Sequence, residues 1–130
     1  MQNNIAVLLP YKDQFIKDNA GSASIWVKDF SKESKLKKNT TIFGFTSNVS
    51  KTFDNFKYVN LKFSNFGVQS KNLKYVNKFI DVLNKKKFSL IEIHNRPSYI
   101  LHIEKNLPNQ KYILVIHNNP QTLRGAVTPK

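Results

Sequence analysis

A regular alternation of short apolar runs and helical stripes is the feature that most constrains the fold of this chain. Each run is four or five residues long, which is short for a helix and typical of a strand in a sheet that is covered on both faces. The runs occupy residues 5–9, 41–45, 57–61, 90–93 and 112–116. Five strands of this kind favour a parallel sheet.

Three segments between the runs carry apolar residues at helical spacing. The apolar positions of the first segment are Ala23, Trp26, Val27 and Phe30. Those of the second are Leu73, Val76, Ile80 and Leu83, and those of the third are Tyr99, Ile100, Ile103 and Leu107. Pro97 has the preferred position just inside the start of the third helix, and Pro108 stops that helix.

The order of these elements predicts an α/β fold with an open, mostly parallel, Rossmann-like sheet and helices on both faces. Right-handed crossovers make 3-2-1-4-5 the favoured strand order, with the first strand in the centre. A length of 130 residues suits a single domain, so we assign residues 1–130 to one unit.

The formal net charge of +13 has two interpretations. One is a partner with negative charge, such as a nucleic acid, an anionic membrane surface or a phosphorylated substrate. The other is genome composition, because 19 of the 21 basic residues are Lys and the chain holds 16 Asn, both of which have A/T-rich codons. The lysines are scattered along the chain, and the sequence leaves both interpretations open.

The first residues and the absence of cysteine bear on the compartment. The N-terminus has no basic leader and only a short apolar run, so we expect no signal peptide. No stretch approaches the roughly 20 apolar residues of a membrane span. Without cysteine there is no disulfide framework, and a cytoplasmic location is the expectation, with peripheral contact to the inner membrane surface as a further possibility raised by the charge.

Polar residues follow several of the predicted strands, where ligands bind in open parallel sheets. The candidates are Gly21 and Ser22 after the first strand, His94, Asn95 and Arg96 after the fourth, and His117 and Asn118 after the fifth. Each of these candidate residues can also be explained by a purely structural role. A serine can simply cap a helix, a histidine at a strand end can be a buried hydrogen-bonded side chain, and Asn95 or Arg96 can precede a helix as a cap.

The sequence lacks the motifs of several classes of binding or catalytic site, which excludes those classes. The dinucleotide fingerprint G-x-G-x-x-G, a Walker loop and the nucleophile elbow G-x-S-x-G do not occur. The chain has no Asp-x-Asp pair to hold a metal-bound nucleotide, and its two strand-end histidines are poorly spaced for a metal. We therefore expect no metal and no bound cofactor.

Four segments resemble the N-terminal domain of GT-B glycosyltransferases of family four. They are IAVLLP at the start, then AGSASIWVKDF, LIEIHNRPSY and YILVIHNNPQTLRG. The resemblance implies retaining transfer of a sugar, of a hexosyl type used in polysaccharide biosynthesis, from a nucleotide sugar. It places most of the acceptor site in the N-terminal half and the nucleotide site, with its Glu-x7-Glu segment, in a C-terminal half.

The resemblance also implies roles for the candidate residues, taken position by position. Gly21 and Ser22 would lie near the donor phosphates across the cleft. The segment His94 to Arg96 would face the acceptor, which is a saccharide or a lipid-linked saccharide. His117 would lie beside the transferred sugar as the catalytic residue, with Asn118 as its neighbour in the substrate site.

The 130 residues do not contain the second half of such an enzyme. The resemblance therefore implies a truncated domain that is inactive alone, and an unpaired fifth strand through which two copies could form a homodimer. A basic nucleic-acid-binding module is the main alternative, although it would favour clustered Arg and exposed aromatic residues, so we expect no nucleic-acid partner. A flavodoxin-like binding domain is a third interpretation.

Overall fold

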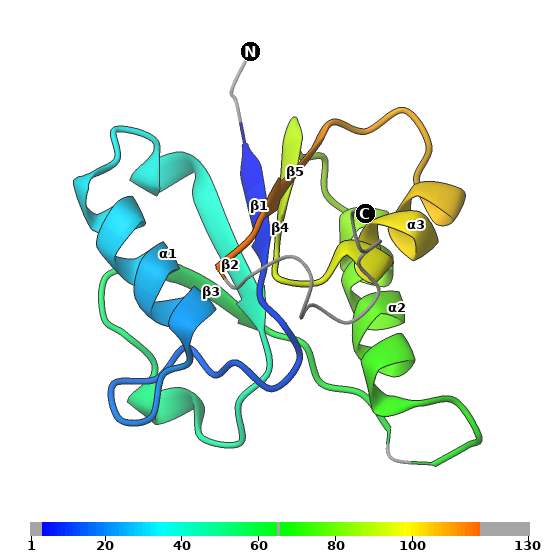
Figure 1. Ribbon diagram of the computed structural model, residues 1–130, viewed down its shortest axis with the longest axis horizontal. Coiled ribbons are helices and arrows are strands. Elements are labelled where there is room, and N and C mark those ends of the chain that lie inside the picture. The colour runs from blue at the N-terminus through cyan, green and yellow to red at the C-terminus, as the bar shows by residue number, and fades with distance from the viewer. Residues whose placement is uncertain (1–3, 65, 118–130) are drawn as a thin grey trace, which may run out of the picture.

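The computed structural model describes residues 4–64 and 66–117 (Figure 1). Its strands are β1 (Ile5–Leu8), β2 (Thr40–Gly44), β3 (Lys57–Asn60), β4 (Leu90–His94) and β5 (Tyr112–Val115). Its helices are α1 (Ser22–Glu33), α2 (Lys71–Leu83) and α3 (Pro97–Asn106), with short 3-10 turns η1 (Lys37–Asn39) and η2 (Val49–Lys51). All five predicted strands and three predicted helices are present, and the strand ends differ from the predicted ones by a single residue.

The five strands form one parallel sheet in the order β3-β2-β1-β4-β5. This confirms the predicted Rossmann-like order and the central position of β1. Val7 in β1 pairs with Ile42 on one side and with Glu92 on the other. Because all strands run in the same direction, their carboxyl ends meet at one edge, where the loops after β1, β4 and β5 come together.

Helices cover the two faces of the sheet unequally. Helix α1 lies on one face and helices α2 and α3 lie on the other (Figure 1). The α1 face is built from a small core that includes Val7, Phe15 and Val27. The opposite face holds a larger core, whose biggest buried side chains include Tyr75 and Phe79 from α2. Alternate residues of each strand thus enter different cores, as a sheet with two covered faces requires.

A buried tyrosine ties α2 to the functional edge of the sheet. The Tyr75 hydroxyl is fully buried and donates a hydrogen bond of 2.7 Å to the carbonyl oxygen of Leu9, the residue that follows β1. Burial raises the pKa of Tyr75 well above its ordinary value of 10.0, so the hydroxyl stays a neutral donor. This contact fixes where the chain leaves β1 and enters the loop before α1.

Strand β5 lies at one end of the described sheet. It pairs with β4, and Ile113 on its surface is 46% exposed. The predicted homodimer through this strand stays a prediction, and the segment 120–130, which could instead cover the strand, lies outside the described residues. Across residues 4–64 and 66–117, no helix has the combined length and apolarity needed to cross a membrane.

Candidate functional site

The loop between β1 and α1 brings an acidic side chain to the start of the helix. Gly21 is the N-cap of α1 and Ser22 is its first residue, and neither provides a side-chain cap. The cap comes from Asp13, whose carboxylate accepts hydrogen bonds from the amide nitrogens of Ala23 at 2.9 Å and Ser24 at 3.2 Å. A carboxylate here also lies favourably in the field of the helix dipole.

Gly21 is required by this arrangement. A Cβ atom at Gly21 would lie 2.5 Å from Cγ of Asp13 and would overlap its carboxylate oxygens. The absence of a side chain thus lets Asp13 approach the helix closely. The amides of Ala23 and Ser24, at the helix start that the resemblance places near the donor phosphates, are therefore engaged by Asp13, and an anion would have to displace that carboxylate to reach them.

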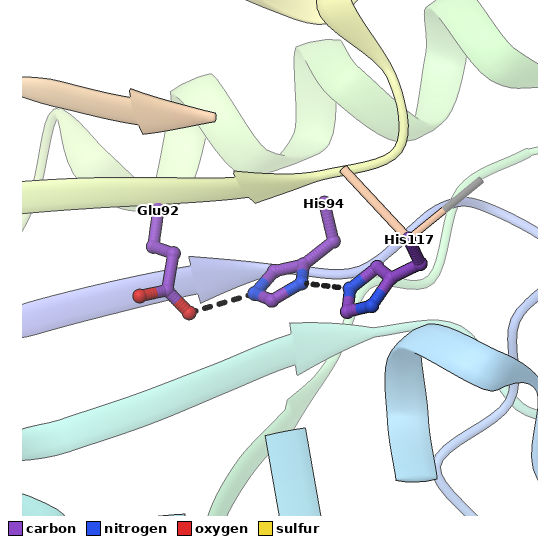
Figure 2. Close-up of polar contacts among 3 residues, drawn as sticks. All are labelled: Glu92, His94 and His117. Atoms are coloured by element: carbon purple, nitrogen blue, oxygen red, sulfur yellow. Dashed lines mark hydrogen bonds and ion pairs between the residues drawn. The ribbon is translucent and has the colours of Figure 1, made fainter. Parts of the chain in front are cut away.

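Three side chains form a hydrogen-bonded row at the ends of β4 and β5 (Figure 2). Nε2 of His94 lies 2.7 Å from Oε2 of Glu92, and Nδ1 of His94 lies 2.8 Å from Nε2 of His117. The two imidazole planes are nearly parallel, at 14°. His94, in the middle of the row, is completely buried, while Glu92 and His117 at its two ends are partly exposed.

The backbone after β4 is shaped to hold this row. Asn95 has a φ of 56°, in the left-handed region that Asn tolerates better than most residues. Its side-chain Oδ1 accepts a hydrogen bond of 2.7 Å from the backbone amide of His117, which fixes the end of β5 against the end of β4. Arg96 folds back, and its Nη1 donates to the carbonyl oxygen of Asn95 at 2.8 Å.

A wide groove of about 820 Å³ opens beside His117. Trp26 lines the groove: its ring centroid lies 5.4 Å from each of the two imidazoles, and it stacks on Phe30 at 4.8 Å. The groove extends along α1, where Ile25 and Phe30 are 45% and 59% exposed. The residues that line it are Ser22, Ile25, Trp26, Asp29, Phe30, Glu33, Ser34 and His117.

The surroundings of His117 favour its neutral form. Burial lowers the pKa of His117 below its ordinary value of 6.5, and the neighbouring His94 lowers it further. The negative charges of Asp13 and Glu92 act in the opposite direction and are the smaller influences. At neutral pH the His117 imidazole is therefore uncharged, and one of its two ring nitrogens carries a lone pair.

The structure brings some of the predicted residues together and separates others. Ser22 and His117 line the same groove, and His94 lies directly behind His117. Asn95, only 4% exposed, and Arg96 hold the backbone and do not line the groove. Asn118 lies outside the described residues.

Sequence reasoning missed Asp13, Glu92 and Trp26 as parts of the site. A signal for Glu92 existed, because alternate residues of a strand share a face and Glu92 is two positions before His94. Trp26 was recognised only as an apolar helical position. The third histidine, His102, joins α3 to α2 through a hydrogen bond of 2.7 Å with Asn77.

The side chains of this site can orient polar groups of a ligand and can transfer protons. Glu92, His94 and His117 lie in a row rather than around one point, and the described residues contain no group of three or more potential ligands that could hold a metal ion. A groove lined by aromatic side chains and a few polar groups is typical of a site for a small organic ligand. Comparison with family models, with curated proteins and with solved structures finds no match for this chain.

Proposed function

We propose that this chain forms the acceptor side of the N-terminal domain of a retaining, nucleotide-sugar-dependent glycosyltransferase of the GT-B type. The observation that carries the proposal is the contact of 2.8 Å between His94 and His117 at the carboxyl edge of a parallel sheet. The two histidines belong to the two segments, LIEIHNRPSY and YILVIHNNPQTLRG, that resemble this family most specifically. Ligands bind at this edge in open α/β sheets.

The groove beside His117 has the composition that a saccharide acceptor needs. Trp26 and Phe30 offer a stacked aromatic surface to the apolar face of a sugar ring. Ser22 and Asp29 also line the groove and supply hydrogen-bonding groups for sugar hydroxyls. His117, which lines the same groove, would then contact the reacting hydroxyl.

In this proposal the donor is bound mainly by a second domain. The departing diphosphate needs fixed positive charges and oriented amides, whereas the acceptor hydroxyl needs orientation. The only charged side chains of the groove are Asp29 and Glu33, and Asp13 engages the nearby helix amides, so the described groove is better suited to a neutral sugar than to a diphosphate. We therefore expect residues 1–130 to bind acceptor-type saccharides weakly and to transfer no sugar alone.

Saturation-transfer NMR with a panel of methyl hexopyranosides tests the proposal. We expect weak binding of at least one hexoside, which His117→Gln reduces about 10-fold by removing a contact in the groove. His102→Gln is the matched control, because His102 makes one hydrogen bond on the opposite face of the sheet. Binding of the panel should be unaffected in that variant.

A single-stranded oligonucleotide serves as the competing probe in the same experiment. Tight, salt-sensitive binding of the oligonucleotide, with no hexoside bound, would contradict the proposal and favour the nucleic-acid-binding alternative. In a complete enzyme of the proposed kind, His117→Ala should lower kcat on the order of 100-fold if His117 contacts the reacting sugar.

A further inference from the structure

The donor and acceptor roles of the three side chains in Figure 2 follow from the carboxylate at one end. An ionised carboxylate only accepts hydrogen bonds, so Nε2 of His94 must carry a proton to bond with Glu92. In a neutral His94 the other nitrogen, Nδ1, then has a lone pair and must accept from Nε2 of His117. The remaining nitrogen of His117, its Nδ1, is left with a lone pair.

Neighbouring groups hold this arrangement in place. Trp26 packs against both imidazoles, and the backbone amide of His117 is held by Asn95. Among the residues that the structure describes, none forms a hydrogen bond with Nδ1 of His117. Since His117 lines the groove, this ring, rather than the buried His94, is the one that a ligand can reach.

Glu92 has no evident structural purpose other than its bond to His94. Its neighbours across the sheet are Val7 and Ile113, which are apolar, and within the described residues its sole polar contact is His94. An ionised side chain on a partly covered face of a sheet is costly unless it is paired. A glutamate in this place therefore points to a use of its charge.

We propose that Glu92, His94 and His117 form a proton relay, with Nδ1 of His117 as the atom that accepts the proton of the hydroxyl being glycosylated. This inference rests on the proposed function, because it needs a hydroxyl as substrate. His117 is the residue in contact with substrate, and Glu92 and His94 act through it.

The proton transfers balance without any further reactant. As the hydroxyl oxygen of the acceptor bonds to the sugar carbon of the donor, the bond from that carbon to the diphosphate breaks, the diphosphate departs with the electron pair, and the proton of the hydroxyl moves to Nδ1 of His117. The proton on Nε2 of His117 moves to Nδ1 of His94, and the proton on Nε2 of His94 moves to the carboxylate of Glu92. Both imidazoles end neutral in their opposite tautomers, Glu92 ends as a carboxylic acid, and the proton is later returned to solvent.

The charged groups around the relay agree with this direction of transfer. Glu92 from β4 and Asp13 from the loop before α1 act on His117 and favour its uptake of a proton. Asp29 and Glu33 of α1 line the groove, and the charge of Asp29 is balanced by Lys28, whose Nζ lies 3.1 Å from Oδ1 of Asp29. The lowered pKa of His117 keeps the imidazole neutral, and thus able to accept, before the reaction.

Long-range proton–nitrogen NMR of the imidazoles in the wild-type chain tests the relay without any ligand. Such spectra distinguish a protonated ring nitrogen from one with a lone pair. At pH 7.5 we expect His94 and His117 both to carry their proton on Nε2. A proton on Nδ1 of His117 would overturn the proposal, and this measurement does not depend on any variant folding.

Glu92→Gln then separates a relay from a merely structural contact. Gln keeps the shape and an oxygen acceptor but removes the charge, so the midpoint of His117 protonation should move to lower pH. Glu104→Gln, an exposed site on α3, is the control for loss of one negative charge and should leave the midpoint in place. An unchanged midpoint in Glu92→Gln would overturn the relay.

The proposed function and the proton relay would be contradicted by different results. If the tautomers and the midpoint behave as expected but no hexoside binds, the proposed function is wrong and the relay has no hydroxyl to serve. If hexosides bind at the groove while His117 has its proton on Nδ1, the relay is wrong and the proposed function stands.

Discussion

The start of α1 and the ends of β4 and β5 lie at the same edge of the sheet, and their polar groups are used differently. At the start of α1, the carboxylate of Asp13 already accepts two of the helix amides. At the ends of β4 and β5, the row of hydrogen-bonded side chains that begins at Glu92 ends at His117, which lines a groove. The first region is closed by an internal partner, and the second is open to a ligand.

This difference teaches that a position at a strand end is not sufficient to identify a binding site. Gly21 and Ser22 have the place and the residue types of an anion site, yet a residue of the preceding loop occupies the donors. His117 has a less specific place, but its partners leave one nitrogen available among the described residues. Whether the polar groups already have hydrogen-bond partners therefore decides which of these two places can bind a ligand.

Removal of the buried histidine should have the largest effect on stability. His94→Ala leaves a cavity and an unpaired Glu92, so we expect a loss of about 3 kcal/mol in the free energy of unfolding. His117→Ala removes a partly exposed ring and should cost about 1 kcal/mol. Urea unfolding of both variants checks the order, and equal losses would contradict the distinction between a buried and a ligand-facing ring.

Removal of the Asp13 carboxylate, which caps α1, should have the next largest effect on stability. Asp13→Ala removes two charge-assisted hydrogen bonds at the start of α1 and should cost about 2 kcal/mol. Asp29→Ala, an exposed acidic residue on the same helix, is the control and should change stability by less than about 0.5 kcal/mol. Inorganic phosphate should shift the amide resonances of Ala23 and Ser24 only in the Asp13→Ala variant.

Gly21→Ala probes the same region through a steric clash. The added methyl group would meet the Asp13 carboxylate, so we expect a loss of about 1–2 kcal/mol in the wild-type background. In the Asp13→Ala background the clash disappears, and the same substitution should be nearly neutral. Additive losses in the double variant would show that Gly21 is needed for another reason.

The lowered pKa of His117 makes stability depend on pH. Between that lowered pKa and the ordinary value of 6.5, the unfolded chain binds more protons at this position than the folded chain does. The free energy of unfolding therefore decreases as pH falls through this window, and the contribution of His117 is fully present above about pH 6.5. Urea unfolding at pH 7.5 and pH 5 should show a smaller acid loss for His117→Gln than for wild type.

Self-association through β5 is the weakest expected effect. The positive charge opposes it at low salt, so dimers should increase as salt screens the charge. Ile113→Lys should shift the balance to monomer, whereas Leu101→Lys, at a more exposed apolar position on α3, should not. Light scattering that shows a 15.1 kDa monomer at high protein concentration and high salt would contradict this prediction.

The fold could be predicted from two features: the periodicity of apolar residues and the handedness of the connections between strands. Apolar runs identified the strands, and right-handed crossovers left few orders for five parallel strands. The same logic placed His94 and His117 at one edge, and their contact of 2.8 Å follows from β4 and β5 being neighbours. The features of the site that depend only on strand order could therefore be predicted from the sequence.

The parts that were missed depend on loop conformation and on packing. Asp13 lies eight positions before Gly21 in a loop without periodicity, so no pattern indicated that its side chain returns to α1. Trp26 and Phe30 share the apolar stripe of α1, but only Val27 and Ala23 are buried by the sheet, which leaves the aromatic pair as the surface of the groove. Which part of a stripe stays uncovered is decided by the neighbouring elements.

Residue-by-residue mapping of hexoside binding by NMR tests most directly that the ends of β4 and β5 form the ligand site. Titration of the best methyl hexopyranoside should shift the resonances of His94, Asn95 and His117 and the indole N–H of Trp26, with little change at the amides of Ala23 and Ser24. Shifts confined to the start of α1, or none at the ends of β4 and β5 despite binding, would contradict this assignment of the site.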